Sequence, residues 1–363
     1  MSRIALLTPT LLIADAISND VYGMQAVLRS RGYDVRLFAN ESTSAVEVSP
    51  LSKIKSFLKA PDDILIYHYS MGWDFGLDLL HQLKCRKVLK YHNITPPEFF
   101  AGISIEYETV CRKGREQVKD IATSNCDLYL ADSQYNAEEL IREGADKSKC
   151  VVVPPFHNID KLAELAPDTS VLDQYVNHTL NILMVGRVAP NKGHGALIET
   201  LAAYRQFYRM NARLLIVGKE APQLAIYSQW LRQLAASKAL DGAVDFVGGV
   251  TDEQLKAFYL AADFFLLTSE HEGFCVPLVE AMAMKVPIIA YASSAVPATI
   301  GDAGVVWHER NPYLLAASID YLNRDESASA ALGLKGRSRY EQVFSTGRLA
   351  QDFTGAMNQA GLI

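Results

Sequence analysis

The sequence lacks the marks of a secreted, membrane-spanning or zinc-binding protein. Its five cysteines are scattered along 363 residues without a C-x-x-C pair, which predicts reduced thiols in the cytoplasm and neither a disulfide framework nor a zinc site. No apolar run approaches the roughly 20 residues of a spanning helix. The start, with Arg3 before the apolar Ile4–Leu7, superficially resembles a signal peptide, but Pro9 interrupts it, and we interpret it as a first buried strand.

The sequence also lacks an excess of positive charge. The formal net charge of -6 argues against a general nucleic-acid binder. Basic residues gather only between Leu83 and Lys119, where eight Lys and Arg stand against four Glu. Two interpretations remain open for this segment: solvated helix faces, or a peripheral contact with the anionic inner surface of the cytoplasmic membrane.

What the sequence does have is the composition and length of a two-domain globular protein. Hydrophobic residues make up 49% and charged residues 21% of the chain, as in soluble proteins. A chain of this length exceeds one ordinary core. Short apolar runs alternate with longer amphipathic ones in both halves, which predicts parallel sheets covered on both faces.

The expected elements follow from this alternation. In the first half we expect strands at Ile4–Leu7, Asp34–Phe38, Ile64–Tyr67, Lys87–Tyr91, Leu128–Ala131 and Cys150–Val153, with helices near Asp20–Arg31, Leu51–Leu58, Phe75–Leu83, Ile105–Ala122 and Asn136–Glu143. In the second half we expect strands at Asn181–Val185, Arg213–Val217, Asp245–Val247, Phe264–Leu267, Pro287–Tyr291 and Gly304–Trp307.

These elements predict an α/β fold of two Rossmann-like, doubly wound domains facing across a cleft, with a C-terminal helix that returns to the first domain. The expected bounds are 1–165 for the first domain, 166–180 for a linker, 181–340 for the second domain and 341–363 for the returning helix. In doubly wound domains the ligand binds outside the carboxyl ends of the strands.

Two glutamates eight positions apart, Glu272 and Glu280, are the most informative pair. Glu272 follows the expected strand Phe264–Leu267, and Glu280 lies about one turn into a helix that Pro277 is suited to open. A helix N-terminus attracts anions and offers free N–H donors. The arrangement therefore predicts a polar ligand, such as a phosphorylated sugar, whose hydroxyls donate to the carboxylates.

A basic turn lies upstream in the same domain, in the stretch Val185-Gly186-Arg187 and on to Lys192-Gly193. Arg187 and Lys192 are five positions apart at the end of an expected strand, close enough to grip one diphosphate. Arginine binds its oxygens bidentately, and lysine acts as a point charge.

Together these motifs resemble a known family. V-G-R-x4-K-G followed by E-G-F-x-x-P-x-x-E-A-M is similar to the retaining family 4 glycosyltransferases, which have the GT-B fold. The similarity is strong from about 181 to 300 and looser over 1–160. It implies a nucleotide-sugar donor as co-substrate and no other cofactor. It also implies that no metal is required, and we find no D-x-D motif that would hold one.

The resemblance assigns roles to matching positions of the second domain. Arg187 and Lys192 would neutralise the donor's diphosphate and stabilise it as leaving group. Glu272 would bind hydroxyls of the transferred sugar, and Glu280 the ribose. The stretch Gly273, Phe274, Cys275 and Val276 would border the donor, with backbone N–H groups of its last three residues facing sugar and phosphate oxygens. Cys275 departs from the glycine of many relatives, and we expect its side chain to be a small buried apolar group.

Residues of the first domain are candidates for the acceptor side and for catalysis. The resemblance places a functional histidine at a strand end, and His92 matches it. His68, at a similar strand end, is the competing candidate. Asn93, next to His92, and Asp15, in the loop Ala14-Asp15-Ala16 where relatives often have a glycine pair, are further candidates for acceptor contacts.

The resemblance implies a retaining hexosyltransferase that uses a GDP- or UDP-linked donor and a glycan or lipid-linked glycan acceptor. From family habit we expect bacterial surface polysaccharide assembly, such as lipopolysaccharide or O-antigen. No carboxylate nucleophile stands out in the first domain, which favours same-face substitution over double displacement. A nucleotide-sugar epimerase or hydrolase on the same fold and a non-catalytic nucleotide-sugar-binding protein are the alternatives. A dehydrogenase is disfavoured because no G-x-G-x-x-G follows the first strand.

Overall fold

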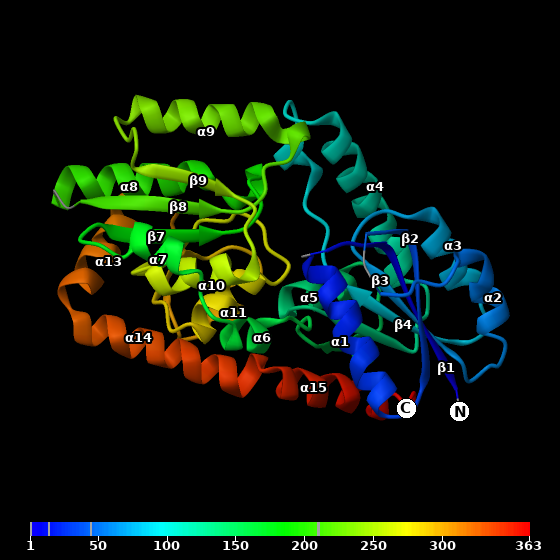
Figure 1. Cartoon of the computed structure of the whole chain (residues 1–363). Coiled ribbons are helices and arrows are strands. Elements are labelled where there is room, and N and C mark those ends of the chain that lie inside the picture. The colour runs from blue at the N-terminus through cyan, green and yellow to red at the C-terminus, as the bar shows by residue number, and fades with distance from the viewer. Residues whose placement is uncertain (1, 14, 44–45, 209–210) are drawn as a thin grey trace. The chain divides into compact units, whose positions relative to one another are not determined.

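The computed structural model describes residues 2–13, 15–43, 46–208 and 211–363. The chain forms two compact units (Figure 1). The first unit comprises Met1–Pro97, Glu108–Asn158 and Ser345–Ile363, and the second comprises Glu98–Tyr107 and Ile159–Phe344. Each unit has its own sheet and its own buried apolar core.

The first unit contains a six-stranded parallel sheet in the order β2-β1-β3-β4-β5-β6. Its strands are β1 (Arg3–Leu11), β2 (Asp34–Ser42), β3 (Ile64–Tyr69), β4 (Arg86–Tyr91), β5 (Leu128–Ala131) and β6 (Cys150–Val152). Its helices are α1 (Ala16–Ser30), α2 (Ile54–Phe57), α3 (Asp74–Gln82), α5 (Gln134–Arg142), α15 (Thr346–Gln359) and most of α4 (Ile105–Ala122). All six residues of β3 are buried, because both faces of a parallel sheet are covered.

The second unit repeats this architecture in the order β12-β11-β10-β7-β8-β9. Its strands are β7 (Leu180–Val185), β8 (Ala212–Val217), β9 (Val244–Gly248), β10 (Phe264–Leu267), β11 (Ile288–Tyr291) and β12 (Val305–Trp307). Its helices are α6 (Ile159–Glu164), α7 (Thr169–Tyr175), α8 (His194–Tyr208), α9 (Ala225–Ser237), α10 (Asp252–Ala261), α11 (Val276–Ala283), α12 (Val296–Ile300), α13 (Pro312–Arg324) and α14 (Glu326–Arg339). The order reverses between β7 and β10, which is the switch point where doubly wound sheets bind ligands.

The segment 166–180 differs from the expected linker, because it holds helix α7. Asp168 caps this helix, accepting a hydrogen bond from the Ser170 backbone N–H at 2.9 Å. Val171 and Tyr175, four positions apart on one face, are buried in the core of the second unit. The polar residues that favoured a linker are therefore the start of a helix.

The C-terminal helix returns to the first unit, as expected. Leu349, Phe353 and Met357 recur every four residues, so they form one apolar stripe on α15, and all three are buried in the core of the first unit. The Phe353 ring meets the Phe156 ring edge to face at 6.0 Å. In Figure 1 α15 lies against α1. No helix in the described part of the chain is long and apolar enough to cross a membrane.

Candidate functional site

The loops after β7 and β10 lie side by side at the switch point of the second unit. The backbone oxygen of Asn191 accepts a hydrogen bond from the Glu270 N–H at 2.8 Å, and the Asn191 amide donates to the His271 oxygen at 3.2 Å. The Thr268 hydroxyl donates to the Gly193 oxygen at 2.9 Å. Since β7 and β10 are neighbours in the sheet, these bonds fix the basic turn to the acidic loop.

Gly193 makes this close approach possible. Its φ is 65°, and a Cβ at this position would lie 2.1 Å from the Thr268 backbone oxygen. Only glycine tolerates both the left-handed conformation and the contact. The glycine of the K-G motif thus sets the position of Lys192, the residue before it.

Lys192 and Glu272 form a bidentate ion pair. The Lys192 ammonium lies 2.8 Å from each oxygen of the Glu272 carboxylate, and Glu272 is only 5% exposed. The backbone N–H of Glu272 donates to the Ser294 hydroxyl at 2.7 Å. A buried carboxylate that loses its cation destabilises the fold. Lys192, predicted to bind the diphosphate, and Glu272, predicted to bind the sugar, are therefore held together as an ion pair.

Glu280 lies on α11 and is paired with a tyrosine from α10. The Tyr259 hydroxyl donates to Glu280 Oε2 at 2.6 Å. Burial raises the pKa of Glu280 to about 7, and the hydrogen bond from Tyr259 opposes this rise only in part. The Glu280 carboxyl therefore changes its charge near neutral pH. A ribose hydroxyl would donate a hydrogen bond to the ionised carboxylate and would accept one from the protonated carboxyl.

The turn that leads into α11 is strained at Cys275. This residue caps the helix with φ 77° and ψ 76°, a region that non-glycine residues rarely occupy. Burial raises the pKa of the Cys275 thiol well above its ordinary value, so the side chain is an inert buried group and not a nucleophile. Pro277 occupies the first turn of α11 as expected.

We expect Cys275→Gly to stabilise the second unit relative to Cys275→Ala. Both variants remove the thiol, but only glycine relieves the left-handed strain, which costs about 1–2 kcal/mol. Thermal unfolding of the two variants checks this. A lower melting temperature for the glycine variant than for the alanine variant would contradict the strain.

The remaining predicted donor-side residues occupy the same region of the second unit. Arg187 follows Gly186 at the end of β7 and is exposed. Phe274 packs its ring edge to face on Phe344 at 5.5 Å, and its backbone oxygen accepts from the Thr299 hydroxyl at 3.0 Å. Phe274 therefore fixes the loop from within the core, while the partly exposed Gly273 and Val276 flank it.

In the first unit the two competing histidines belong to one buried cluster. His92 Nε2 lies 3.0 Å from His68 Nδ1, with the rings stacked. His92 Nδ1 lies 2.9 Å from Asp132 Oδ2. The Lys90 ammonium lies 2.7 Å from Asp132 Oδ1 and donates to the Val153 backbone oxygen. We call Asp20, His68, Lys90, His92 and Asp132 the histidine cluster.

Burial and neighbouring groups shift the pKa values of three residues in the histidine cluster. Burial raises the pKa of Asp20, against the opposing effect of Lys90 and His92. Burial also acts on Asp132, but the neighbouring His92 and Lys90 outweigh it and hold the pKa of Asp132 below its ordinary value. Burial, with the neighbouring His92 and Lys90, lowers the pKa of His68 well below its usual range. His68 is therefore neutral at physiological pH.

Asp20, His68 and His92 also bring three possible ligand atoms within 4.8 Å of one another. The Lys90 ammonium lies 3.9 Å from Asp20 Oδ2, so it would repel a divalent cation placed among these atoms. The Asp20 carboxylate is also engaged by the Phe156 backbone N–H at 2.8 Å. We therefore interpret the cluster as a polar network of the protein's own groups.

The other two acceptor-side candidates have structural partners. Asn93 adopts φ 72°, and its amide donates to Asn136 at 2.8 Å and to Glu139 at 3.3 Å. Asp15 caps α1 by accepting from the Ser18 N–H at 3.0 Å. Its neighbour Ala14 in the expected loop lies outside the described residues.

Sequence reasoning missed four residues of these sites: Asp20, Lys90, Asp132 and Tyr259. A signal existed for two of them. Lys90 interrupts the apolar run of β4, and Asp132 follows β5 directly, and a charge at a buried strand end requires a partner. Asp20 and Tyr259 lie on helices, where one polar residue carries no such signal.

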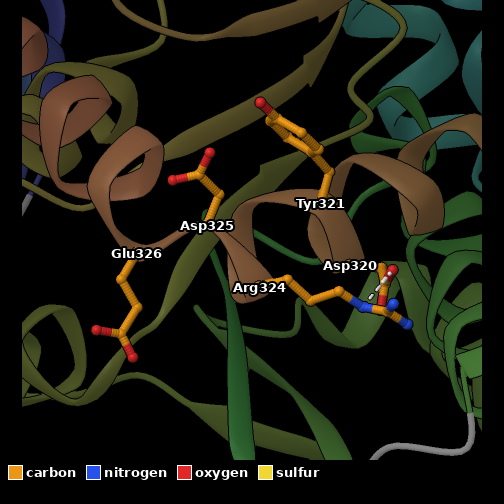
Figure 2. A pocket seen from close by; sticks show the side chains of 5 residues that line it. All are labelled: Asp320, Tyr321, Arg324, Asp325 and Glu326. Carbon is orange, nitrogen blue, oxygen red and sulfur yellow. Dashed lines mark hydrogen bonds and ion pairs between the residues drawn. The ribbon is translucent and has the colours of Figure 1, made fainter.

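A surface hollow between α13 and α14 is a poor site for a diphosphate (Figure 2). It is lined by Asp320, Tyr321, Arg324, Asp325 and Glu326. The Arg324 guanidinium is engaged by Asp320 at 3.0 Å, and two further carboxylates remain. This acidic lining would repel an anion, in contrast to the basic turn at Lys192.

Part of the chain is similar to a known protein family. Residues 177–339 match the model of Glycosyl transferases group 1. An O-antigen chain mannosyltransferase B of Escherichia coli is 28% identical over 287 residues, covering 76% of this chain and 70% of the relative. A D-inositol 3-phosphate glycosyltransferase of Salinispora tropica is 26% identical over 260 residues, covering 68% and 53%. The chain spans about half the length of the first curated relatives it matches.

Solved structures show the same fold over the whole chain. A sucrose-phosphate synthase from Thermosynechococcus elongatus superposes with a TM-score of 0.77 at 20% identity, covering 99% of both chains. HepE from Anabaena, solved with UDP and glucose, gives a TM-score of 0.75 at 18% identity and covers 99% of this chain and 100% of that one. The expected fold class, GT-B with two Rossmann-like domains, is confirmed.

Proposed function

We propose that the protein is a retaining glycosyltransferase that takes a hexose from a GDP- or UDP-linked donor, since residues 177–339 match the model of Glycosyl transferases group 1. The observation that carries the proposal is the pairing of Lys192 with Glu272 at the β7–β10 switch point. A sugar nucleotide needs both a cation for its diphosphate and a carboxylate for its sugar hydroxyls, and this pair supplies both at one place.

The donor binds to the second unit in this proposal. Arg187 and Lys192 receive the diphosphate and oppose the negative charge that grows on it as the glycosidic bond breaks. Glu272 accepts hydrogen bonds from sugar hydroxyls, and Glu280 contacts the ribose. The N–H groups of the Cys275 turn, at the N-terminus of α11, complete the anion site. These groups stabilise the leaving group without a metal ion.

The acceptor in this proposal is a glycan or lipid-linked glycan. Its hydroxyl attacks from the face that the diphosphate leaves, and the departing phosphate takes the hydroxyl proton, so that the anomeric configuration is retained. The O-antigen mannosyltransferase relative favours a role in bacterial surface polysaccharide assembly, at the cytoplasmic face of the membrane. The five free cysteines agree with a reducing compartment.

A thermal-shift screen against UDP, GDP, ADP and their sugars is the first test. We expect one nucleotide class to raise the melting temperature of the second unit, because a ligand that binds only the folded state stabilises it. Glu280→Ala should abolish the shift, and Arg187→Ala should cut transfer while the fold remains intact. An unchanged shift in Glu280→Ala would refute the ribose contact. Donor turnover that never needs an acceptor would favour an epimerase or hydrolase instead.

A further inference from the structure

Tyr259 on α10 connects three elements of the second unit beside the ribose candidate Glu280. The residue is only 1% exposed, and its ring stacks on the Phe265 ring of β10 at 6.2 Å. Its hydroxyl oxygen lies 2.6 Å from Glu280 Oε2 and 3.3 Å from the Pro277 backbone oxygen, both on α11. The stacked ring therefore fixes the point from which the hydroxyl reaches α11.

The single proton of this hydroxyl goes to Glu280. Burial, together with the neighbouring Glu280, holds the pKa of Tyr259 well above its ordinary value, so the phenol keeps its proton and has one O–H to donate. The contact at 2.6 Å has the length of a bond from a hydroxyl to a carboxylate, whereas 3.3 Å is long. Oε2 is thus an acceptor, and any proton that Glu280 binds must lie on Oε1.

The second oxygen of Glu280 stays open. No group in the described part of the chain donates a hydrogen bond to Oε1. Although the carboxyl is enclosed, Glu280 keeps part of its surface accessible, and Oε1 is not among the enclosed side-chain oxygens that lack a partner. Glu280 therefore offers a ligand one accessible oxygen, and the bond from Tyr259 sets the orientation of the carboxyl that carries it.

We propose that Tyr259 is a positioning residue of the donor site, which holds Glu280 by Oε2 so that Oε1 meets a hydroxyl of the donor's ribose. This inference deepens the proposed glycosyl transfer and rests on it. A ribose hydroxyl can donate to Oε1 or accept from it, so the contact depends on where the carboxyl points. Tyr259 acts through Glu280 and touches no substrate itself.

Removing the Tyr259 hydroxyl should also change the protonation of Glu280. Burial raises the pKa of Glu280 to about 7, and the hydrogen bond from Tyr259 opposes this rise because it favours the ionised carboxylate. Asp252, in the first turn of α10, acts with burial, and burial holds the pKa of the Cys275 thiol well above its ordinary value. Without the Tyr259 hydroxyl, Glu280 should therefore stay protonated to a higher pH.

Tyr259→Phe has a matched control in Tyr204→Phe. Both tyrosines are buried in the second unit, but the Tyr204 hydroxyl has no hydrogen-bond partner among the described residues. Carboxyl 13C resonances of glutamate-labelled, nucleotide-free protein, assigned with Glu280→Gln, report the titration of Glu280. Its midpoint should rise from about pH 7 to about pH 8 in Tyr259→Phe and stay in place in Tyr204→Phe. An unmoved midpoint in Tyr259→Phe would overturn the proposal.

The ribose contact is measured with pairs of nucleotides. The affinities of GDP and UDP, each compared with its 2′-deoxy and 3′-deoxy forms, give the contribution of each ribose hydroxyl. We expect one hydroxyl to strengthen binding about tenfold in the wild-type protein. This contribution should be largely lost in Tyr259→Phe and kept in Tyr204→Phe, because the hydroxyl and the oriented carboxyl form one contact. An equal contribution in the wild-type protein and in Tyr259→Phe would refute the positioning role.

Steady-state kinetics complete the test. Because a ribose contact is made equally in the ground state and the transition state, Tyr259→Phe should raise the KM for the nucleotide sugar about tenfold and leave kcat nearly unchanged. A loss of kcat at unchanged KM would contradict the proposal. If neither GDP nor UDP binds the wild-type protein, the proposed function and the ribose contact fail together. If a nucleotide binds but the Glu280 titration is the same in Tyr259→Phe, only the role of Tyr259 fails.

Discussion

Replacing Lys192 with alanine is expected to lower the transfer rate about 100- to 1,000-fold, the usual effect of removing one group that stabilises a leaving charge. The same change should lower the free energy of unfolding of the second unit by about 3 kcal/mol. The reason is that Glu272, at 5% exposure, loses the cation that contacts both of its oxygens at 2.8 Å. Steady-state kinetics and thermal unfolding measure the two effects.

The double variant Lys192→Ala, Glu272→Ala separates stability from catalysis. Removing the carboxylate as well leaves no uncompensated charge, so we expect most of the lost stability to return while transfer stays absent. Lys335→Ala is the control, because both side chains of its pair with Asp302 are exposed, at 59% and 83%. Such a pair contributes little. Full activity in Lys192→Ala would refute the diphosphate contact.

The second large effect is a pH dependence of stability that depends on Glu280. Its folded-state pKa of about 7 lies above the ordinary value of 4.5. Between these values the folded protein binds more protons than the unfolded chain, so stability falls as the pH rises. Below pH 4.5 Glu280 is protonated in both the folded and the unfolded state, so its burial no longer lowers the free energy of unfolding. Above pH 7 this loss of stability reaches about 3 kcal/mol, at 1.36 kcal/mol for each pKa unit.

We therefore expect Glu280→Gln to stabilise the second unit at pH 8 and to match the wild-type protein near pH 4.5. Glutamine keeps the shape of the protonated carboxyl and never ionises, so it removes the cost of the buried charge. Melting temperatures measured from pH 4.5 to pH 8.5 report the difference. Glu199→Gln, on the exposed face of α8, should follow the wild-type curve throughout. A difference that does not grow with pH would refute the raised pKa.

Much of the fold followed from local patterns. Each of the twelve expected strands appears in the structure, with ends that shift by at most four residues, because continuous apolar runs between helices specify buried parallel strands. The segment 166–180 differed from the expected linker, because Asp168 and Ser170 at the start of α7 also have the sequence pattern of a turn. The buried face of α7, Val171 and Tyr175, becomes visible as such only when the core it packs against is known.

The residues of the candidate sites also divide into those that local patterns predicted and those that they did not. The turn with Arg187 and Lys192 and the pair Glu272 and Glu280 could be found from sequence, because each lies directly behind a strand or at the start of a helix. The partners Asp132, Asp20 and Tyr259 could not be paired in this way, since they come from elements distant in the chain. The sequence left His68 and His92 as rivals, whereas the fold places their rings 5.2 Å apart in one cluster.

By itself, then, the sequence determined the two doubly wound domains and the returning helix, and it singled out the candidate donor-side residues, because strand periodicity, helix starts and short motifs are local properties of the chain. Only the tertiary structure decided which groups are paired, buried or strained. It joined Lys192 to Glu272, raised the pKa of Glu280 by burial, and turned the His92 ring toward Asp132. Electrostatic free energies depend on distances and burial set by residues far apart in sequence, and so they appear only once the chain has folded.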